Sequence, residues 1–177
     1  MSTSDLTIDI PPPPSEDARL DELQMVAAVR QYDRTDPYYL HLLDEVPYAL
    51  FDAIVTEAGY PSDIDYIKRL SNRMRPVIIR LKAHFNSLRP WELARKHNVY
   101  FDYDYVESAQ TPSYPSGHTA QAHYTAGMLS RKYPELQGEL QKLASDIEAS
   151  RLIRGVHFIS DNEAGKMVAN QMLRGTP

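Results

Sequence analysis

The chain has 177 residues, contains no cysteine and carries a formal net charge of −5 at pH 7, with 19 basic and 24 acidic residues. The length fits a single domain, the lack of cysteine excludes disulfides and thiolate metal sites, and the acidic balance argues against nucleic-acid binding. No apolar run approaches the roughly 20 residues that a membrane-spanning helix needs. We therefore expect one domain with neither a nucleic-acid nor a membrane partner.

The first residues lack the basic and apolar segments of a signal peptide, so they predict a soluble cytoplasmic protein. The alternative is that a leader has been trimmed away. The four prolines Pro11–Pro14 favour an extended polyproline arm. We therefore divide the chain into a Pro-rich N-terminal arm, residues 1–14, and a helical domain, residues 15–177.

Apolar residues recur at helical spacing through most of this domain, and no segment reads convincingly as a strand. We predict an all-α, single-domain bundle of about six or seven helices. Ser15 is expected to cap the first helix, and the others cover about residues 37–58, 62–89, 91–97, 115–132, 134–154 and 160–173.

Several helix boundaries rest on proline or on capping residues. Pro47 is expected to kink the second helix, and Pro76 to kink or divide the third. Pro90 should end the third helix, because the residue before a proline avoids the α conformation. The motif Ser160-x-x-Glu163 is a capping box that should start the last helix.

Three basic residues are candidate ligands for an oxyanion: Lys82, Arg89 and Arg151. Two helical turns separate Lys82 from Arg89, so both can project from one helix face about 10 Å apart. An arginine guanidinium matches a phosphate with two parallel hydrogen bonds. Taken alone, however, Lys82 and Arg89 are more typical of the solvated flank of an amphipathic helix.

A small-residue turn, Pro115-Ser116-Gly117-His118, follows a loop expected over residues 99–115 and opens a helix. We expect the free amides of Ser116, Gly117 and His118 to point at an anion, with support from the helix dipole. Gly117 lets the anion approach the backbone. By itself the turn is also typical of an ordinary loop-to-helix junction.

His157 and Asp161 are separated by one helical turn. The carboxylate can reach one ring nitrogen and fix the tautomer, which leaves the other nitrogen as a nucleophile. Gly155 allows the sharp turn that presents the histidine. The alternative is that Asp161, next to Ser160, serves only the helix N-terminus.

About a dozen positions together have the residue types, spacing and order of one phosphoryl-transfer site, and so many agreements are not a coincidence. They form three segments: Lys82-x6-Arg89-Pro90, Pro115-Ser116-Gly117-His118 and Ser150-Arg151-x3-Gly155-x-His157-x3-Asp161. The pattern resembles the signature of the type 2 phosphatidic acid phosphatase superfamily, which also holds the vanadium-dependent haloperoxidases. Within it, the chain is most similar to the bacterial class A nonspecific acid phosphatases, which also carry a proline run before the first helix.

The resemblance implies a metal-independent acid phosphatase acting on small phosphomonoesters, with nucleotides as one candidate class. In such an enzyme His157 attacks phosphorus to form a phosphohistidine, Asp161 orients it, and His118 acts first as acid and then as base. The remaining site residues would hold the phosphate oxygens: Lys82, Arg89, Ser116, Gly117 and Arg151. No metal or cofactor is implied, although vanadate can mimic phosphate. Family members often pack as dimers, so a homodimer is a candidate assembly.

Two other functions use the same residues. In a haloperoxidase, vanadate occupies the phosphate site; the small size of this chain argues against it, as does Thr111, where haloperoxidases tend to carry His or Phe. A catalytically idle phosphate-binding protein is the other alternative. Against it stand His118, His157 and Asp161, because binding alone needs no nucleophile with a fixed tautomer.

Overall fold

The computed structural model describes residues 7–177, and all regular secondary structure in this range is helical, which confirms the all-α fold. The helix expected over residues 37–58 is divided in two. The α-helices are α1 (Glu16–Tyr32), α2 (Pro37–Glu45), α3 (Pro47–Glu57), α4 (Ile64–Phe85), α5 (Pro90–Lys96), α6 (Gly117–Lys132), α7 (Gln137–Ile153) and α8 (Ile159–Arg174), with short 3₁₀ turns η2 (Glu107–Ala109) and η3 (Pro134–Leu136).

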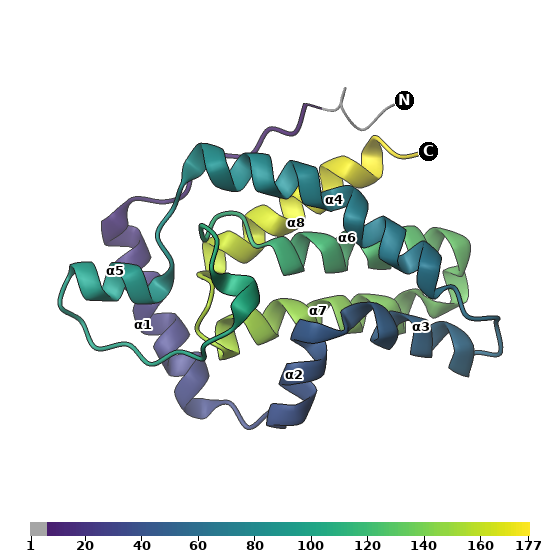
Figure 1. Ribbon diagram of the computed structural model, residues 1–177, viewed down its shortest axis with the longest axis horizontal. Helices are drawn as coiled ribbons and strands as arrows, with labels where there is room; N and C mark the ends of the chain where they lie inside the picture. The colour runs from purple at the N-terminus through teal and green to yellow at the C-terminus, as the bar shows by residue number, and fades with distance from the viewer. Residues whose placement is uncertain (1–6) are drawn as a thin grey trace.

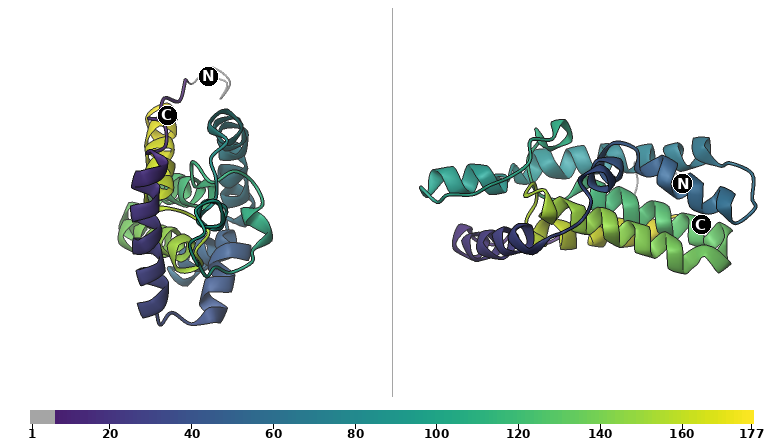
Figure 2. Two further views of the ribbon diagram at one scale, coloured as in Figure 1. Left: turned by 90° about the vertical axis from the view of Figure 1, so that its left-hand side faces the viewer. Right: turned by 90° about the horizontal axis from the view of Figure 1, so that it is seen from below.

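Helix α6 lies at the centre of the bundle, where it packs against α4, α7 and α8 (Figure 1). Small residues allow these helices to approach closely. A methyl group on Gly165 of α8 would meet the carbonyl oxygen of Ser116 at 2.7 Å. The close contact therefore fixes the start of α6 against the first turns of α8. At one end of the bundle, α1 packs against α5 (Figure 2).

The prolines act differently from what the sequence predicts. At Pro47 the helix does not merely kink: Val46 leaves the helical conformation, with φ of −134°, and α3 starts anew at the proline. Pro76 lies inside α4 without dividing it. Pro90 does not end α4, which stops at Phe85 because Asn86 adopts the left-handed conformation, with φ of 43°. Pro90 instead starts α5, directly after Arg89.

The capping box expected at Ser160 is wrong. Helix α8 begins at Ile159, and Asp161 caps it by accepting a hydrogen bond from the amide of Phe158 at 2.9 Å. Both the amide and the hydroxyl of Ser160 donate to the carboxylate of Glu22 instead, each at 2.7 Å. These bonds tie the start of α8 to α1.

The described part of the N-terminal arm packs against the helices. Ile8 and Ile10 are buried, and the backbone of Asp9 exchanges two hydrogen bonds with the side chain of Gln171 on α8. The hydroxyl of Tyr114 donates to the carbonyl oxygen of Pro11 at 2.6 Å. Residues 1–6 of the predicted arm lie outside the described residues.

Candidate active site

The buried aspartate, lysine, arginine and histidine side chains of residues 7–177 gather in one place. Buried ions are costly unless they are paired or put to use, so their concentration marks a candidate functional site. We call this group the charge cluster; its members are Arg19, Asp44, Lys82, Arg89, Arg151, His157 and Asp161.

His157 is held in one tautomer between Asp161 and Arg89. Its Nδ1 lies 3.0 Å from Oδ2 of Asp161, and its Nε2 lies 3.0 Å from Nη1 of Arg89. Because a guanidinium can only donate, Nε2 must carry the lone pair and Nδ1 the proton. Burial lowers the pKa of His157 well below its usual range, and the charges of Arg89 and Lys82 lower it further. The ring is therefore neutral, with its lone pair on Nε2.

Asp161 is itself fixed by four hydrogen-bond donors. Its Oδ1 accepts from Nη2 of Arg19 at 2.8 Å. Its Oδ2 accepts from the hydroxyl of Ser113, from the amide of Phe158 and from His157. With every donor in place, the carboxylate serves both the helix N-terminus and the histidine, two roles that the sequence presents as alternatives.

The cationic side chains of Arg89 and Lys82 are held by backbone carbonyl oxygens. Arg89 donates from Nε to the carbonyl oxygen of Thr111 and from Nη1 to that of Val156, each at 2.7 Å. Lys82 donates to the carbonyl oxygens of Pro112 and Ser113. Burial and the charge of Arg89 lower the pKa of Lys82 to about 7.

The turn at residues 115–118 differs from the prediction at its first amide. Ser116 is the N-cap of α6, and its amide donates to the carbonyl oxygen of Asp161 at 2.9 Å, so it is not free for an anion. The amides of Gly117 and His118 have no hydrogen-bond partner within the described residues. Two amides at this helix N-terminus, rather than three, therefore remain for an oxyanion.

Asp44 contacts both Arg151 and His118. Nη1 of Arg151 lies 2.5 Å from Oδ1 of Asp44, and both side chains are buried. Nε2 of His118 lies 3.1 Å from the carbonyl oxygen of Asp44 and 3.3 Å from its Oδ1. Burial and the charge of Arg151 lower the pKa of His118 to about 3, although Asp44 acts to raise it.

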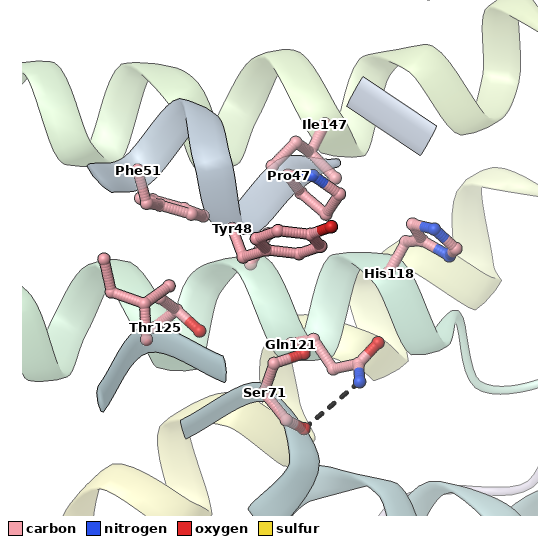
Figure 3. Close-up of a pocket in the computed structure, with 10 residues that line it drawn as sticks. Pro47, Tyr48, Phe51, Ser71, His118, Gln121, Thr125 and Ile147 are labelled. Atoms are coloured by element: carbon pink, nitrogen blue, oxygen red, sulfur yellow. Dashed lines mark hydrogen bonds between the residues drawn. The ribbon is translucent and has the colours of Figure 1, made fainter. Parts of the chain in front are cut away.

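A small cavity of about 50 Å³ opens beside His118 (Figure 3). Its wall is mostly apolar, with Pro47, Phe51 and Ile147 from α3 and α7. Gln121 lines it on α6, where its amide donates to the carbonyl oxygen of Ser71 at 3.1 Å. His118 itself lines the cavity.

The eight predicted site residues lie together. A methyl group on Gly117 would sit 3.9 Å from Cε of Lys82, which places the turn at residues 115–118 beside the cations. The structure adds residues that carry no motif: Asp44 and Arg19, with Ser108, Thr111 and Ser113 from the loop. A local signal marks two of them. Asp44 lies in the last turn of α2 and Arg19 near the start of α1, and both charges oppose the helix dipole.

The family model of the PAP2 superfamily matches residues 49–174. A non-specific acid phosphatase from Salmonella typhi is 36% identical over 87 residues, which are 49% of this chain and 34% of that protein. One from Providencia stuartii is 39% identical over 67 residues, 38% of this chain and 27% of that protein. The matched stretch thus spans about a third or less of these curated relatives.

A transmembrane PAP2-type phosphatidylglycerolphosphate phosphatase from Bacillus subtilis shares the fold, with a TM-score of 0.60 and 17% sequence identity. The comparison covers 91% of this chain and 86% of that one. It overturns the cytoplasmic location predicted from the sequence, because this fold is found in a transmembrane enzyme. Within residues 7–177, no helix is both long enough and apolar enough to cross a membrane.

Proposed function

The chain belongs to the PAP2 superfamily, and from this premise we propose that it is a metal-independent phosphatase that hydrolyses small phosphomonoesters through a phosphohistidine. The observation that carries the proposal is the neutral His157, whose Nδ1 is bound to Asp161 and whose Nε2 lone pair faces Arg89. A phosphoryl group bound by Arg89 would lie within reach of that lone pair.

In the first step, Nε2 of His157 attacks phosphorus, a P–N bond forms and the P–O bond to the leaving group breaks. His118 gives a proton to the leaving oxygen. A bound dianion brings negative charge beside His118 and so raises its pKa from the low value of the free protein. In the second step, His118 takes a proton from water, which attacks phosphorus and releases phosphate and His157.

The charge of the site favours a monoester dianion. With Lys82 protonated and the histidines neutral, the charge cluster contains four cationic and two anionic side chains. The excess of two positive charges would be balanced by a phosphate monoester, which is a dianion at neutral pH. Phosphoryl transfer needs such charge stabilisation more than covalent machinery, and here fixed cations can supply what a metal supplies elsewhere.

The cavity beside His118 supports an uncharged leaving group. Its wall is largely apolar, which suits an alcohol with little charge. This lining favours esters of an alkyl, aryl or other uncharged alcohol. Vanadate binding at the phosphate site, a homodimer and the lack of a nucleic-acid partner remain predictions.

The test is release of phosphate from p-nitrophenyl phosphate between pH 5 and 8 with EDTA present. Wild type should turn over, His157→Ala should be inactive, and His41→Ala, which removes an exposed histidine, should match wild type. Quenching with alkaline detergent during turnover should trap a phosphoprotein in wild type only, and later acid treatment should release its phosphate, as expected of a phosphohistidine. Loss of wild-type activity with EDTA, or full activity in His157→Ala, would contradict the proposal.

A further inference from the structure

Asp44 stands apart from the recognised site residues. It lies in none of the three sequence segments, and it precedes residues 49–174, which the family model matches. Its carboxylate is buried in the last turn of α2, where the helix dipole disfavours a negative charge. It accepts hydrogen bonds from Arg151 at 2.5 Å and from the hydroxyl of Ser108 at 3.0 Å.

The contact with His118 selects a tautomer. Both acceptors near Nε2, the carbonyl oxygen and Oδ1 of Asp44, can only accept, so Nε2 must carry the proton. Nδ1 of His118 has no hydrogen-bond partner in the described part of the chain. The atom left for a leaving-group oxygen is therefore Nδ1. This pairing mirrors that of His157 with Asp161, in which the carboxylate takes Nδ1 and leaves Nε2.

The contact with Arg151 leaves one edge of the guanidinium open. Asp44 binds Nη1, Nη2 has a single long contact of 3.4 Å to Ser108, and the buried Nε has no partner among residues 7–177. The Nε and Nη2 donors lie on the same edge, the one that matches two oxygens of a phosphate. Asp44 thus anchors the guanidinium by one nitrogen while that edge stays available.

We propose that Asp44 is a positioning residue that directs Nδ1 of His118 to the leaving-group oxygen and the Nε–Nη2 edge of Arg151 to the phosphoryl oxygens. The inference rests on the proposed phosphatase function. Asp44 touches no reacting atom in this scheme; it acts through the acid and through one phosphate ligand. Its charge also favours the protonated imidazole that donates to the leaving group.

Leaving-group dependence separates this role from a structural one. Phenyl phosphate needs protonation of its leaving oxygen more than p-nitrophenyl phosphate does, because p-nitrophenolate is the more stable anion. Asp44→Asn keeps the shape and an acceptor but removes the charge. We expect it to lower kcat/KM for phenyl phosphate about tenfold more than for p-nitrophenyl phosphate. The matched control is Glu45→Gln, the exposed neighbouring acid, which should affect neither substrate.

An equal loss on both esters, or no loss, would overturn the proposal. So would tighter binding of inorganic phosphate in Asp44→Asn with an unchanged ester ratio, because Asp44 would then merely occupy the anion site. If Asp44→Asn does not fold, Asp44→Glu, which keeps the charge but displaces it, should show the same preferential loss on phenyl phosphate. An equal loss of activity on both esters in Asp44→Glu would also overturn the proposal.

A measurement without turnover separates this inference from the proposed function. The nitrogen-15 spectrum of the wild-type histidine rings should show His118 as the neutral Nε2–H tautomer. An Nδ1–H tautomer would overturn the role of Asp44 even in an active enzyme. Wild type that hydrolyses no phosphate ester, but shows the Nε2–H tautomer, would instead contradict the phosphatase function and leave the contact between Asp44 and His118 established.

Discussion

Nη2 of Arg19 on α1 lies 2.8 Å from Oδ1 of Asp161 on α8, and both side chains are buried. The other oxygen of the same carboxylate accepts from Nδ1 of His157. The guanidinium of Arg19 also donates to the hydroxyl of Ser87, and it lies over the ring of Phe158, 4.0 Å from its centroid. Helix α1, outside all three motif segments, thus fixes the carboxylate that orients the proposed nucleophile.

Replacing Arg19 should therefore reduce both stability and activity. Arg19→Met leaves the buried Asp161 without its cation, and loss of one partner of a buried ion pair costs about 3–5 kcal/mol of unfolding free energy. The loss of orientation at His157 should lower kcat by about a hundredfold. Urea unfolding and p-nitrophenyl phosphate turnover measure the two effects. The matched control is Arg34→Met, which replaces an exposed arginine just after α1 and should change neither quantity.

Gly165 should tolerate no side chain. A Cβ there would meet the carbonyl oxygen of Ser116 at 2.7 Å and the amide nitrogen of Ala120 at 3.2 Å, so α6 and α8 would have to separate. We expect Gly165→Ala to cost about 1–3 kcal/mol and to displace the turn at residues 115–118, with loss of activity.

Gly138→Ala is the comparison for this change, because a Cβ there meets nothing within 4 Å in α7. Alanine is the better helix former, so this variant should be as stable as wild type or about 0.5–1 kcal/mol more stable. Thermal unfolding of the two variants side by side measures the difference. Equal stability of both would show that the contact between α6 and α8 is looser than described.

The affinity for a dianion should fall as the pH rises above about 7. Burial, together with Arg89, lowers the pKa of Lys82 to about 7. Below that pH, Lys82 is charged before the anion arrives; above it, binding must take up a proton, and affinity should fall by up to about tenfold per pH unit. His118 is also neutral in the free protein, and the proton that it takes up when a dianion binds adds to this slope, whereas His157 stays neutral.

Calorimetric titration with tungstate between pH 6 and 9 tests this, because tungstate remains a dianion throughout. Lys82→Met should bind weakly at every pH and lose the part of the slope that Lys82 contributes. A flat profile in wild type would mean that Lys82 keeps its proton in the free protein.

The sequence predicted best what is local. His157 and Asp161 lie one turn apart, so their contact follows from chain geometry, and the small residues after Pro115 place an N-terminus beside them. The amide of Ser116 was expected to be free, yet it binds the carbonyl oxygen of Asp161. That bond depends on how α6 packs against α8, which no local pattern encodes.

Asp44 and Arg19 show the same limit more strongly. The partners Asp44 and Arg151 are 107 residues apart, and Arg19 and Asp161 are 142 apart. Only tertiary packing brings such pairs together. In the sequence, the sign for such a residue is a charge that the helix dipole disfavours at that end of the helix. This sign can be read only after the helix ends are known.

The cavity beside His118 provides a last prediction, about the size of the leaving group. Ala122 on α6 lines this cavity and is buried, so Ala122→Leu should fill much of its 50 Å³. No residue of the charge cluster lines the cavity, so the cluster should keep its affinity for inorganic phosphate. We expect KM for phenyl phosphate to rise about tenfold while the Ki of phosphate stays within about twofold of wild type, a difference that reports a pocket contact.

Overpacking can cost about 1–3 kcal/mol of stability, so the unfolding of Ala122→Leu is measured alongside. Ala28→Leu, at an exposed position of α1, is the control and should leave KM and Ki unchanged. A parallel rise of KM and Ki in Ala122→Leu would show that the cavity supports the phosphate site and does not receive the leaving group.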